Sequence, residues 1–216
     1  MTLETTIAAE PVALLAERAL FWPAASTLII ADAHWGKAAS FRAAAIAVPE
    51  GATGADLARL DQALDRTGAR SLVILGDLLH ARASFAPALL EAVAAWRARR
   101  AALDITLVRG NHDARAGDPP AAWGFRCVDE PHACGPFALC HYPEVLAEGH
   151  VLAGHLHPAV LLTGLGRQRE RLPCFLVGPR RTILPAFGSF TGAATVRPAA
   201  DERVFVVAGD SVLQVS

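Results

Sequence analysis

The sequence is poor in lysine, in excess charge of either sign and in long apolar runs. Lys37 is its only lysine, and the formal net charge of the 216 residues is -1. A nearly neutral protein has no strong overall field, so a nucleic acid or membrane surface would have to be bound by local patches. No segment approaches the ~20 apolar residues that cross a bilayer. Residues 1–10 have no basic residue before their apolar positions, unlike a secretory signal. We expect a cytoplasmic protein without a membrane span.

The sequence also lacks any pair of cysteines spaced as C-x-x-C. Its four cysteines, Cys127, Cys134, Cys140 and Cys174, are scattered along the chain. In a chain of this length they fit buried thiols better than a disulfide framework or a zinc ribbon. Cys140 directly precedes His141, but neighbours in a strand point to opposite faces. Cys140 is therefore not expected to bind a metal.

Short apolar runs alternate with stretches of helical spacing in the first half of the chain. Residues 56–67 and 86–100 have helical periodicity, with Gly68 ending the first stretch and Pro87 in the first turn of the second. In the second half, short β-like runs are separated by glycine and proline. These runs are residues 160–163, 172–177, 203–207 and 212–215. We expect an α/β protein with two mixed β-sheets packed face to face and flanked by helices, forming one domain over residues 1–216.

Five short segments carry side chains that bind metals. They are Asp32-Ala33-His34, Gly76-Asp77, Gly110-Asn111-His112-Asp113, His141 and Gly154-His155-Leu156-His157. Each follows an apolar, strand-like run. The runs are residues 28–31, 72–75, 105–108, 137–140 and 151–153. Open sheets place their active sites at the carboxyl ends of strands, so we expect the five segments to meet there.

The residue types in these segments suit a site for cations and phosphate. In an extended chain the spacing of Asp32 and His34 puts both side chains on the same side. A glycine before Asp77 allows a sharp turn, and one carboxylate can bridge two cations with its two oxygens. His112 beside Asp113 suits an imidazolium held by a carboxylate. Nitrogen and oxygen donors without thiolate favour Mn²⁺, Fe or Zn²⁺ over Ca²⁺, and we expect Mn²⁺.

In this order the motifs D-x-H, G-D, G-N-H-D, a lone histidine and G-H-x-H resemble the signature of the calcineurin-like metallophosphoesterase superfamily, from Asp32 to His157. Other segments are similar to one bacterial branch, the PdeM-type proteins described as ligase-associated DNA damage response endonucleases. These segments are Leu20-Phe21-Trp22-Pro23, residues 31–38, Val48-Pro49-Glu50-Gly51, Gly76-Asp77-Leu78-Leu79-His80, Cys140-His141-Tyr142-Pro143 and residues 154–158.

The resemblance implies a four-layer sandwich fold and a role for each motif residue. It implies two divalent metal ions bridged by Asp77. One ion would be held by Asp32, His34, Asp77 and His157, and the other by Asp77, Asn111, His141 and His155. The resemblance also implies that His112 stays off the metals and faces the phosphate as a cation or general acid, oriented by Asp113.

Several residues have both a functional and a structural interpretation. His80 is either a group beside the metals or part of the first turn of a following helix. Lys37 either contacts a substrate phosphate or begins a helix, and Trp35 either stacks on a base or packs in the core. His132 and His150 are expected to be structural.

A run of arginines follows the last motif. The run consists of Arg167, Arg169, Arg171, Arg180 and Arg181. It is either a surface for a phosphate backbone or a solvated loop. Arg167, Arg169 and Arg171 join Lys37 and His80 as candidate substrate contacts.

These observations predict a metal-dependent phosphodiesterase, and the resemblance implies a nuclease that works in DNA repair with a DNA ligase and other factors. Two other functions remain open. A phosphomonoesterase or small-molecule phosphodiesterase would share the same metal core. A non-catalytic interaction scaffold would be expected to lack ligands or the motif histidine, and here none is missing.

Overall fold

The computed structural model describes all residues except 1, 39–40, 42–50, 165, 167 and 216. Two of the sequence predictions fall on residues outside this set: the segment at residues 48–50 and the candidate substrate contact Arg167. The described helices with defined bounds are α2 (Ala52–Thr67), α3 (Pro87–Arg99), α4 (Asn111–Ala116) and three 3-10 turns, η1 (Pro23–Ala25), η2 (Arg82–Ser84) and η3 (Ala121–Trp123). In the described part of the chain, no helix is long and apolar enough to cross a membrane.

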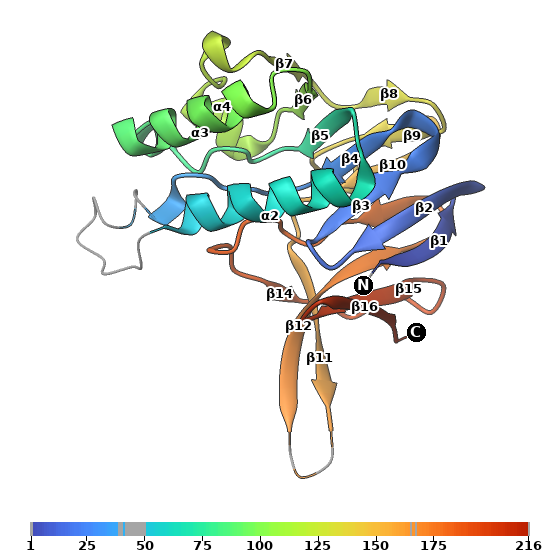
Figure 1. Ribbon diagram of the computed structural model, residues 1–216. Coiled ribbons are helices and arrows are strands. Elements are labelled where there is room, and N and C mark those ends of the chain that lie inside the picture. The colour runs from blue at the N-terminus through green and yellow to red at the C-terminus, as the bar shows by residue number, and fades with distance from the viewer. Residues whose placement is uncertain (1, 39–40, 42–50, 165, 167, 216) are drawn as a thin grey trace.

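The first sheet has seven strands in the order β1 to β7 (Figure 1). They are β1 (Leu3–Ile7), β2 (Glu10–Leu15), β3 (Ala19–Trp22), β4 (Thr27–Ile30), β5 (Ser71–Leu75), β6 (Asp104–Val108) and β7 (Phe125–Val128). Strands β1 to β4 are antiparallel neighbours, whereas β4, β5, β6 and β7 run parallel. The parallel half brings the carboxyl ends of β4, β5 and β6 to one edge.

The second sheet has nine strands and is built from the second half of the chain. Its strands are β8 (His132–Cys134), β9 (Phe137–Leu139), β10 (His150–Ala153), β11 (Pro158–Thr163), β12 (Arg169–Val177), β13 (Arg181–Ile183), β14 (Ala194–Thr195), β15 (Arg203–Ala208) and β16 (Ser211–Gln214). The order is β14-β11-β12-β13-β10-β9-β8, with β15 between β12 and β16 on a side branch. Strands β9, β10 and β13 are parallel neighbours. The prediction of two mixed sheets flanked by helices is confirmed.

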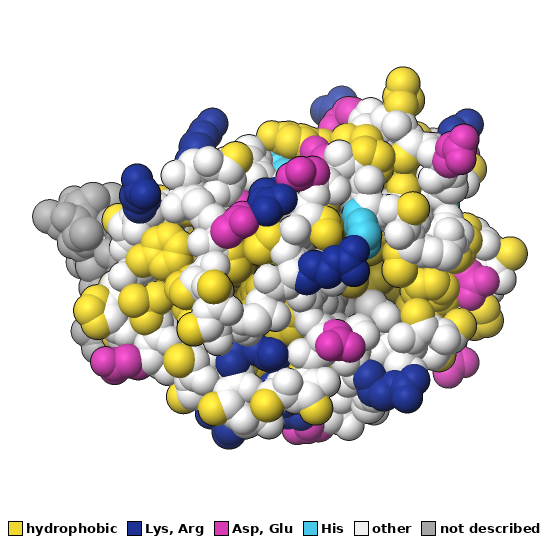
Figure 2. All heavy atoms as spheres, turned by 90° about the horizontal axis from the view of Figure 1, so that it is seen from above, with side chains coloured by type: hydrophobic (Ala, Val, Ile, Leu, Met, Phe, Trp, Pro, Cys, Tyr) yellow, Lys and Arg dark blue, Asp and Glu magenta, His cyan; other side chains and the backbone are white. Residues whose placement is uncertain are grey.

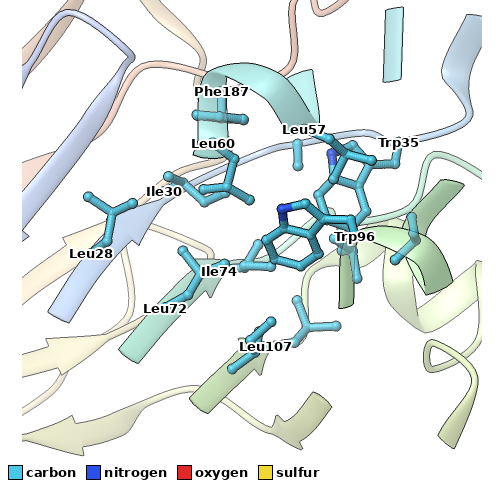
Figure 3. Packing of buried hydrophobic residues seen from close by; sticks show 14 of the residues in the cluster. Leu28, Ile30, Trp35, Leu57, Leu60, Leu72, Ile74, Trp96, Leu107 and Phe187 are labelled. Atoms are coloured by element: carbon cyan, nitrogen blue, oxygen red, sulfur yellow. The ribbon is translucent and has the colours of Figure 1, made fainter. Parts of the chain in front are cut away.

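Alternating residues of the parallel strands separate two apolar cores. Leu28, Ile30, Leu72, Ile74 and Leu107 face α2 and α3, where they pack with Trp35, Trp96 and Phe187 (Figure 3). The residues between them, Ile29, Val73, Leu75 and Val108, pack against Phe137, Phe175 and Phe205 of the second sheet. This period of two is expected for strands covered on both faces. The sheets therefore lie face to face, with the described helices against the first sheet.

The helix boundaries follow the predicted signals. Helix α2 ends at Gly68, which has φ of 64° and caps the helix by donating its N–H to the carbonyl of Leu64. Helix α3 begins at Pro87, where the missing N–H costs no helical hydrogen bond. Trp35 is 1% exposed and lies edge-on to Trp96, which confirms the packing interpretation.

The cysteines and surface charges also match simple expectations. All four cysteines are free thiols; Cys140 and Cys174 are buried and the other two are half-buried. Cys140 packs with Ala138, Val151 and Ala153, away from the neighbouring His141. On the face shown in Figure 2, basic and acidic side chains are interspersed with apolar ones.

Candidate metal centre

The loops that follow five strands bring the predicted motifs together. Asp32 and His34 follow β4, Asp77 follows β5 and Asn111 follows β6 in the first sheet; His141 follows β9, and His155 and His157 follow β10 in the second. All five strands present their carboxyl ends at the same edge of the molecule. The expected placement at strand ends is confirmed.

The donor atoms form two groups, each with its ligand atoms within 4.8 Å of one another. The first group is Asp32, His34 and His157, and the second is Asp77, His141 and His155. Asp77 joins them, because its Oδ2 lies 3.8 Å from Nε2 of His34 and its Oδ1 lies 3.5 Å from Nε2 of His141. The side-chain oxygen of Asn111 lies 3.0 Å from the same nitrogen of His141.

Hydrogen bonds behind the donors direct lone pairs into the centre. Nδ1 of His141 lies 3.1 Å from the carbonyl of Leu75, and Nδ1 of His157 lies 3.1 Å from the carbonyl of Gly192. A carbonyl can only accept, so each Nδ1 carries the proton and each Nε2 keeps its lone pair. Nε2 of His141 faces Nδ1 of His155 at 3.1 Å. Such a convergence of acceptors is what a cation requires.

Several buried polar atoms at the centre have no hydrogen-bond partner among the described residues. They are Oδ1 of Asp32, both ring nitrogens of His34 and Nε2 of His157. An unsatisfied buried polar group costs about 1–3 kcal/mol, and more when it is charged. Bound cations would remove this cost, so the residues present fit the two metal ions that the family resemblance implies.

Burial sets the protonation of the donors before any ion binds. Desolvation, followed by the nearby charge of His157, lowers the pKa of His34 to about 2. Burial also lowers the pKa of His155 and raises the pKa of Asp77. The imidazoles are therefore neutral, the form that binds metal. A buried carboxylate such as Asp77 is costly when ionised unless a cation lies beside it.

The backbone carries strain at the donors. Five of the candidate ligands have left-handed φ values: 53° at Asp32, 46° at His34, 52° at Asp77, 69° at His155 and 47° at His157. The prediction that Asp32 and His34 share a side through extended spacing is therefore wrong in its reason. Their side chains meet because the chain turns at each residue. Left-handed residues other than glycine cost about 1–3 kcal/mol each and gather at functional sites.

Gly76 permits the turn into Asp77, and we expect Gly76→Ala to destabilise the protein by more than about 1 kcal/mol. Its φ is 78°, and a Cβ there would overlap the ring of His141, so strain and a clash add. Denaturant midpoints measured with chelator test this without metal binding. Gly209→Ala is the matched control, because Gly209 has φ of 56° but nothing within 4 Å of its added Cβ. Equal losses in both variants would show that the His141 contact is unimportant.

His112 lies beside the two groups on a different support from the one predicted. Its Nδ1 is 2.6 Å from the carbonyl of His80, its backbone N–H donates to Asp77 Oδ1 at 2.9 Å, and its Nε2 lies 3.9 Å from Asp77 Oδ2. Nδ1 therefore carries a proton and Nε2 faces the centre.

Asp113 does not orient the His112 ring, so that prediction is wrong. Its carboxylate accepts from the backbone N–H groups of Gly110 at 3.0 Å and Leu79 at 3.3 Å. The reason is that Asp113 is the third residue of α4, where an acidic side chain folds back onto the helix start. Burial raises its pKa to about 6. Asp113 fixes the loop whose next residue, His80, holds His112.

The remaining candidates separate into near and far residues. His80 lies in a loop rather than a helix, with its ring stacked on His112 at 4.9 Å and edge-on to His34 at 5.6 Å. Lys37 begins a helical turn, and its ammonium lies 5.9 Å from the ring of Phe41.

The other residues weighed from the sequence lie away from the donors. Arg169 and Arg171 are exposed on β12, outside the donor groups. His150 is buried and bonded to Thr182 at 2.9 Å, and His132 lies on β8, which agrees with structural roles for both.

Two residues at the centre were missed by the sequence reasoning. Glu130 accepts from the backbone N–H groups of His141 at 2.6 Å and Tyr142 at 2.9 Å, which fixes the loop that presents His141. The ring of Tyr142 lies 4.5 Å from that of His155. The position of Tyr142 directly after His141 was an available signal, whereas Glu130 had none.

Comparison with known families agrees with this geometry. A model of the calcineurin-like phosphoesterase family matches residues 25–157, which contain every candidate ligand. The chain belongs to the calcineurin-like phosphoesterase family. It is a metal-dependent phosphoesterase, and its His and Asp groups are suited to hold the ions.

Solved structures extend the comparison. The phosphoesterase is similar to the crystal structure of Pseudomonas putida nuclease MPE, with 42% identity, full coverage of both chains and a TM-score of 0.88. That likeness agrees with the resemblance to the PdeM-type branch. A structure of Yfce, a phosphoesterase from E. coli, has 16% identity and a TM-score of 0.42 over 88% of this chain and 97% of that chain, too low to carry an argument. No curated protein matches the chain.

Proposed function

We propose that this phosphoesterase is a phosphodiesterase that uses two divalent ions and acts as a nuclease in DNA repair. The observation that carries the proposal is the pair of donor groups joined by Asp77, with His112 beside them and facing inward. Two adjacent cations suit the displacement of one phosphate ester oxygen by water, because both the attacking and the leaving oxygen need stabilisation.

The proposed ligand sets follow from the two groups. One ion is held by Asp32, His34, Asp77 and His157, and the other by Asp77, Asn111, His141 and His155. When bound, these ions supply Lewis acidity toward the phosphoryl oxygens and lower the pKa of the attacking water. We propose Mn²⁺, with Fe or Zn²⁺ as alternatives, because the donors are nitrogen and oxygen without thiolate.

His112 completes the reaction as general acid. The oxygen of water bonds to phosphorus, the P–O bond to the leaving group breaks, and the departing alkoxide takes a proton from Nε2 of His112. The carbonyl of His80 accepts from Nδ1 of His112 at 2.6 Å, so the ring keeps its other proton on Nδ1 and its orientation. The proton lost by water passes to solvent.

The assignment to DNA rests on the relatives. The similar Pseudomonas putida protein is described as a nuclease, and the segments shared with PdeM-type proteins support a role in repair beside a DNA ligase. The metal core alone fits a phosphomonoesterase equally well, since both reactions use the same ions and the same general acid.

Hydrolysis of bis(p-nitrophenyl) phosphate beside p-nitrophenyl phosphate tests the proposal. We expect faster turnover of the diester, dependent on Mn²⁺ and abolished by chelator, because the second ester group occupies the site in the natural reaction. A parallel preparation carrying Asp77→Asn reports contaminating activity. Preferential turnover of the monoester would replace the proposal with a phosphatase, and cleavage of an oligonucleotide then follows only if the diester is turned over.

A further inference from the structure

Strands β11 and β12 form a two-stranded ribbon that extends beyond the body of the protein (Figure 1). Their register runs from Ala159 opposite Pro173 to Thr163 opposite Arg169. In the described structure, β14 pairs only with Pro158 and Ala159, and β15 pairs with β12 only from Cys174 onward. The outer part of the ribbon therefore has no third strand, and its sides are open.

The two faces of the ribbon differ in composition. Opposed residues of an antiparallel pair share a face, so Val160 and Leu172 lie on the face that carries Leu162 and Glu170. Val160, Leu162 and Leu172 pack against an apolar cluster of the second sheet. The other face carries Leu161, Thr163, Arg169 and Arg171, and it is turned away from that cluster.

The outward face carries positive charge without a compensating acid. Arg169 and Arg171 are both exposed, and neither guanidinium has an ion-pair or hydrogen-bond partner in the part of the chain that the structure describes. By contrast, Arg100 is bonded to Asp61 and Asp65, and Arg109 to Asp118 and Asp129. The pairing elsewhere makes the ribbon an uncommon place of unpaired positive charge on this nearly neutral protein.

The ribbon starts at the metal centre. Strand β11 begins at Pro158, the residue after the candidate ligand His157. Strands rise about 3.3 Å per residue, so Arg171, opposite Leu161, lies roughly 13 Å along the ribbon, and Arg169, opposite Thr163, roughly 20 Å. A mononucleotide or small diester bound at the metals cannot span that length, whereas a polynucleotide can.

We propose that the ribbon is an arm that binds the phosphate backbone of a nucleic acid, several nucleotides from the bond that is cut. The inference rests on the proposed nuclease function and deepens it by assigning a polymeric substrate. Arginine binds phosphate through paired N–H donors, and phosphate contacts of this kind position a strand without reading its sequence. Open ribbon sides and an acid-free outward face suit a polyanion better than a protein strand.

The double variant Arg169→Ala with Arg171→Ala tests the arm in the Mn²⁺-loaded enzyme. We expect a raised KM for a long DNA oligonucleotide with unchanged kcat, and unchanged turnover of bis(p-nitrophenyl) phosphate, which reports on the metal centre alone. Each lost phosphate contact lowers the salt slope by about 0.7 on a single strand, so the gap between wild type and variant should narrow about sevenfold from 50 to 200 mM salt.

The control is Arg70→Ala with Arg99→Ala, which removes the same charge from the opposite end of the first sheet. Arg99 ends α3, and Arg70 precedes β5 and bonds only weakly to Ser26 at 3.4 Å. This control should keep the wild-type KM and salt slope. Equal effects of both pairs would reduce the arm to net charge and overturn it, as would unchanged DNA kinetics. Failure of the wild type on the small diester would instead overturn the proposed function itself.

Discussion

Replacing Asp77 with asparagine is expected to remove metal from both positions and to slow diester hydrolysis by about a thousandfold or more. Asp77 is the candidate ligand that approaches both groups, at 3.8 Å from His34 and 3.5 Å from His141. Asparagine keeps the shape but has one carbonyl oxygen and no charge, so it cannot bridge two cations. Losing several kcal/mol of charge stabilisation in the transition state corresponds to this factor. Elemental analysis and the hydrolysis rate measure the two effects.

The control for this variant is Asp201→Asn, the same chemical change at an exposed turn, which should keep wild-type metal content and rate. Unfolding of the metal-free proteins separates metal loss from misfolding. Burial raises the pKa of Asp77, which means that its ionised form is disfavoured without cations, and metal-free Asp77→Asn should be at least as stable as the metal-free wild type. Retention of two ions by Asp77→Asn would rule out a bridging role.

The parallel core of the fold was predictable because local pattern and tertiary structure agree there. Residues 72–75 and 105–108 were expected as strands and lie in β5 and β6. Such runs are apolar throughout because both faces of these strands are covered. Gly68 and Pro87 mark helix boundaries by backbone geometry alone, without reference to the rest of the chain.

The antiparallel strands β1 to β3 were not predicted, because their turns lack the usual residues. Ile7 pairs with Glu10, so the hairpin turn is Ala8-Ala9, with φ of 51° and 65°. Two-residue hairpins with positive φ normally use asparagine and glycine. Arg18, with φ of 62°, takes the glycine position of the next turn. Packing of the sheet, rather than turn chemistry, holds both turns.

The sequence predicted which residues meet at the centre but not how the backbone delivers them. The left-handed turns at Asp32 and His34 are held by hydrogen bonds from their N–H groups to the carbonyls of Gly76 and Asp77, at 3.2 Å and 2.9 Å. These partners lie far away in sequence, so no local pattern reveals the turns. Asp113 was misassigned for a related reason, since its helix position decides its partners more than its neighbour His112 does.

His112→Ala is expected to lower turnover by about 100- to 10,000-fold, the usual contribution of a general acid, while both metal positions stay filled. Its Nε2 faces Asp77 but its Nδ1 is bonded to the carbonyl of His80, so the ring stands beside the donor groups rather than within them. Elemental analysis and kcat for an oligonucleotide measure the two quantities. His132→Ala, a half-buried histidine on β8, should leave both unchanged.

The leaving group distinguishes a general acid from a group that only binds phosphate. Nitrophenolate departs without a proton, so His112→Ala should slow bis(p-nitrophenyl) phosphate much less than a diester with an alkoxide leaving group. A cation that only holds the phosphate would lose the same factor on both substrates. Equal losses would therefore assign His112 to phosphate binding, and loss of metal from His112→Ala would instead place it among the ligands, because only a ligand is needed to retain the ions.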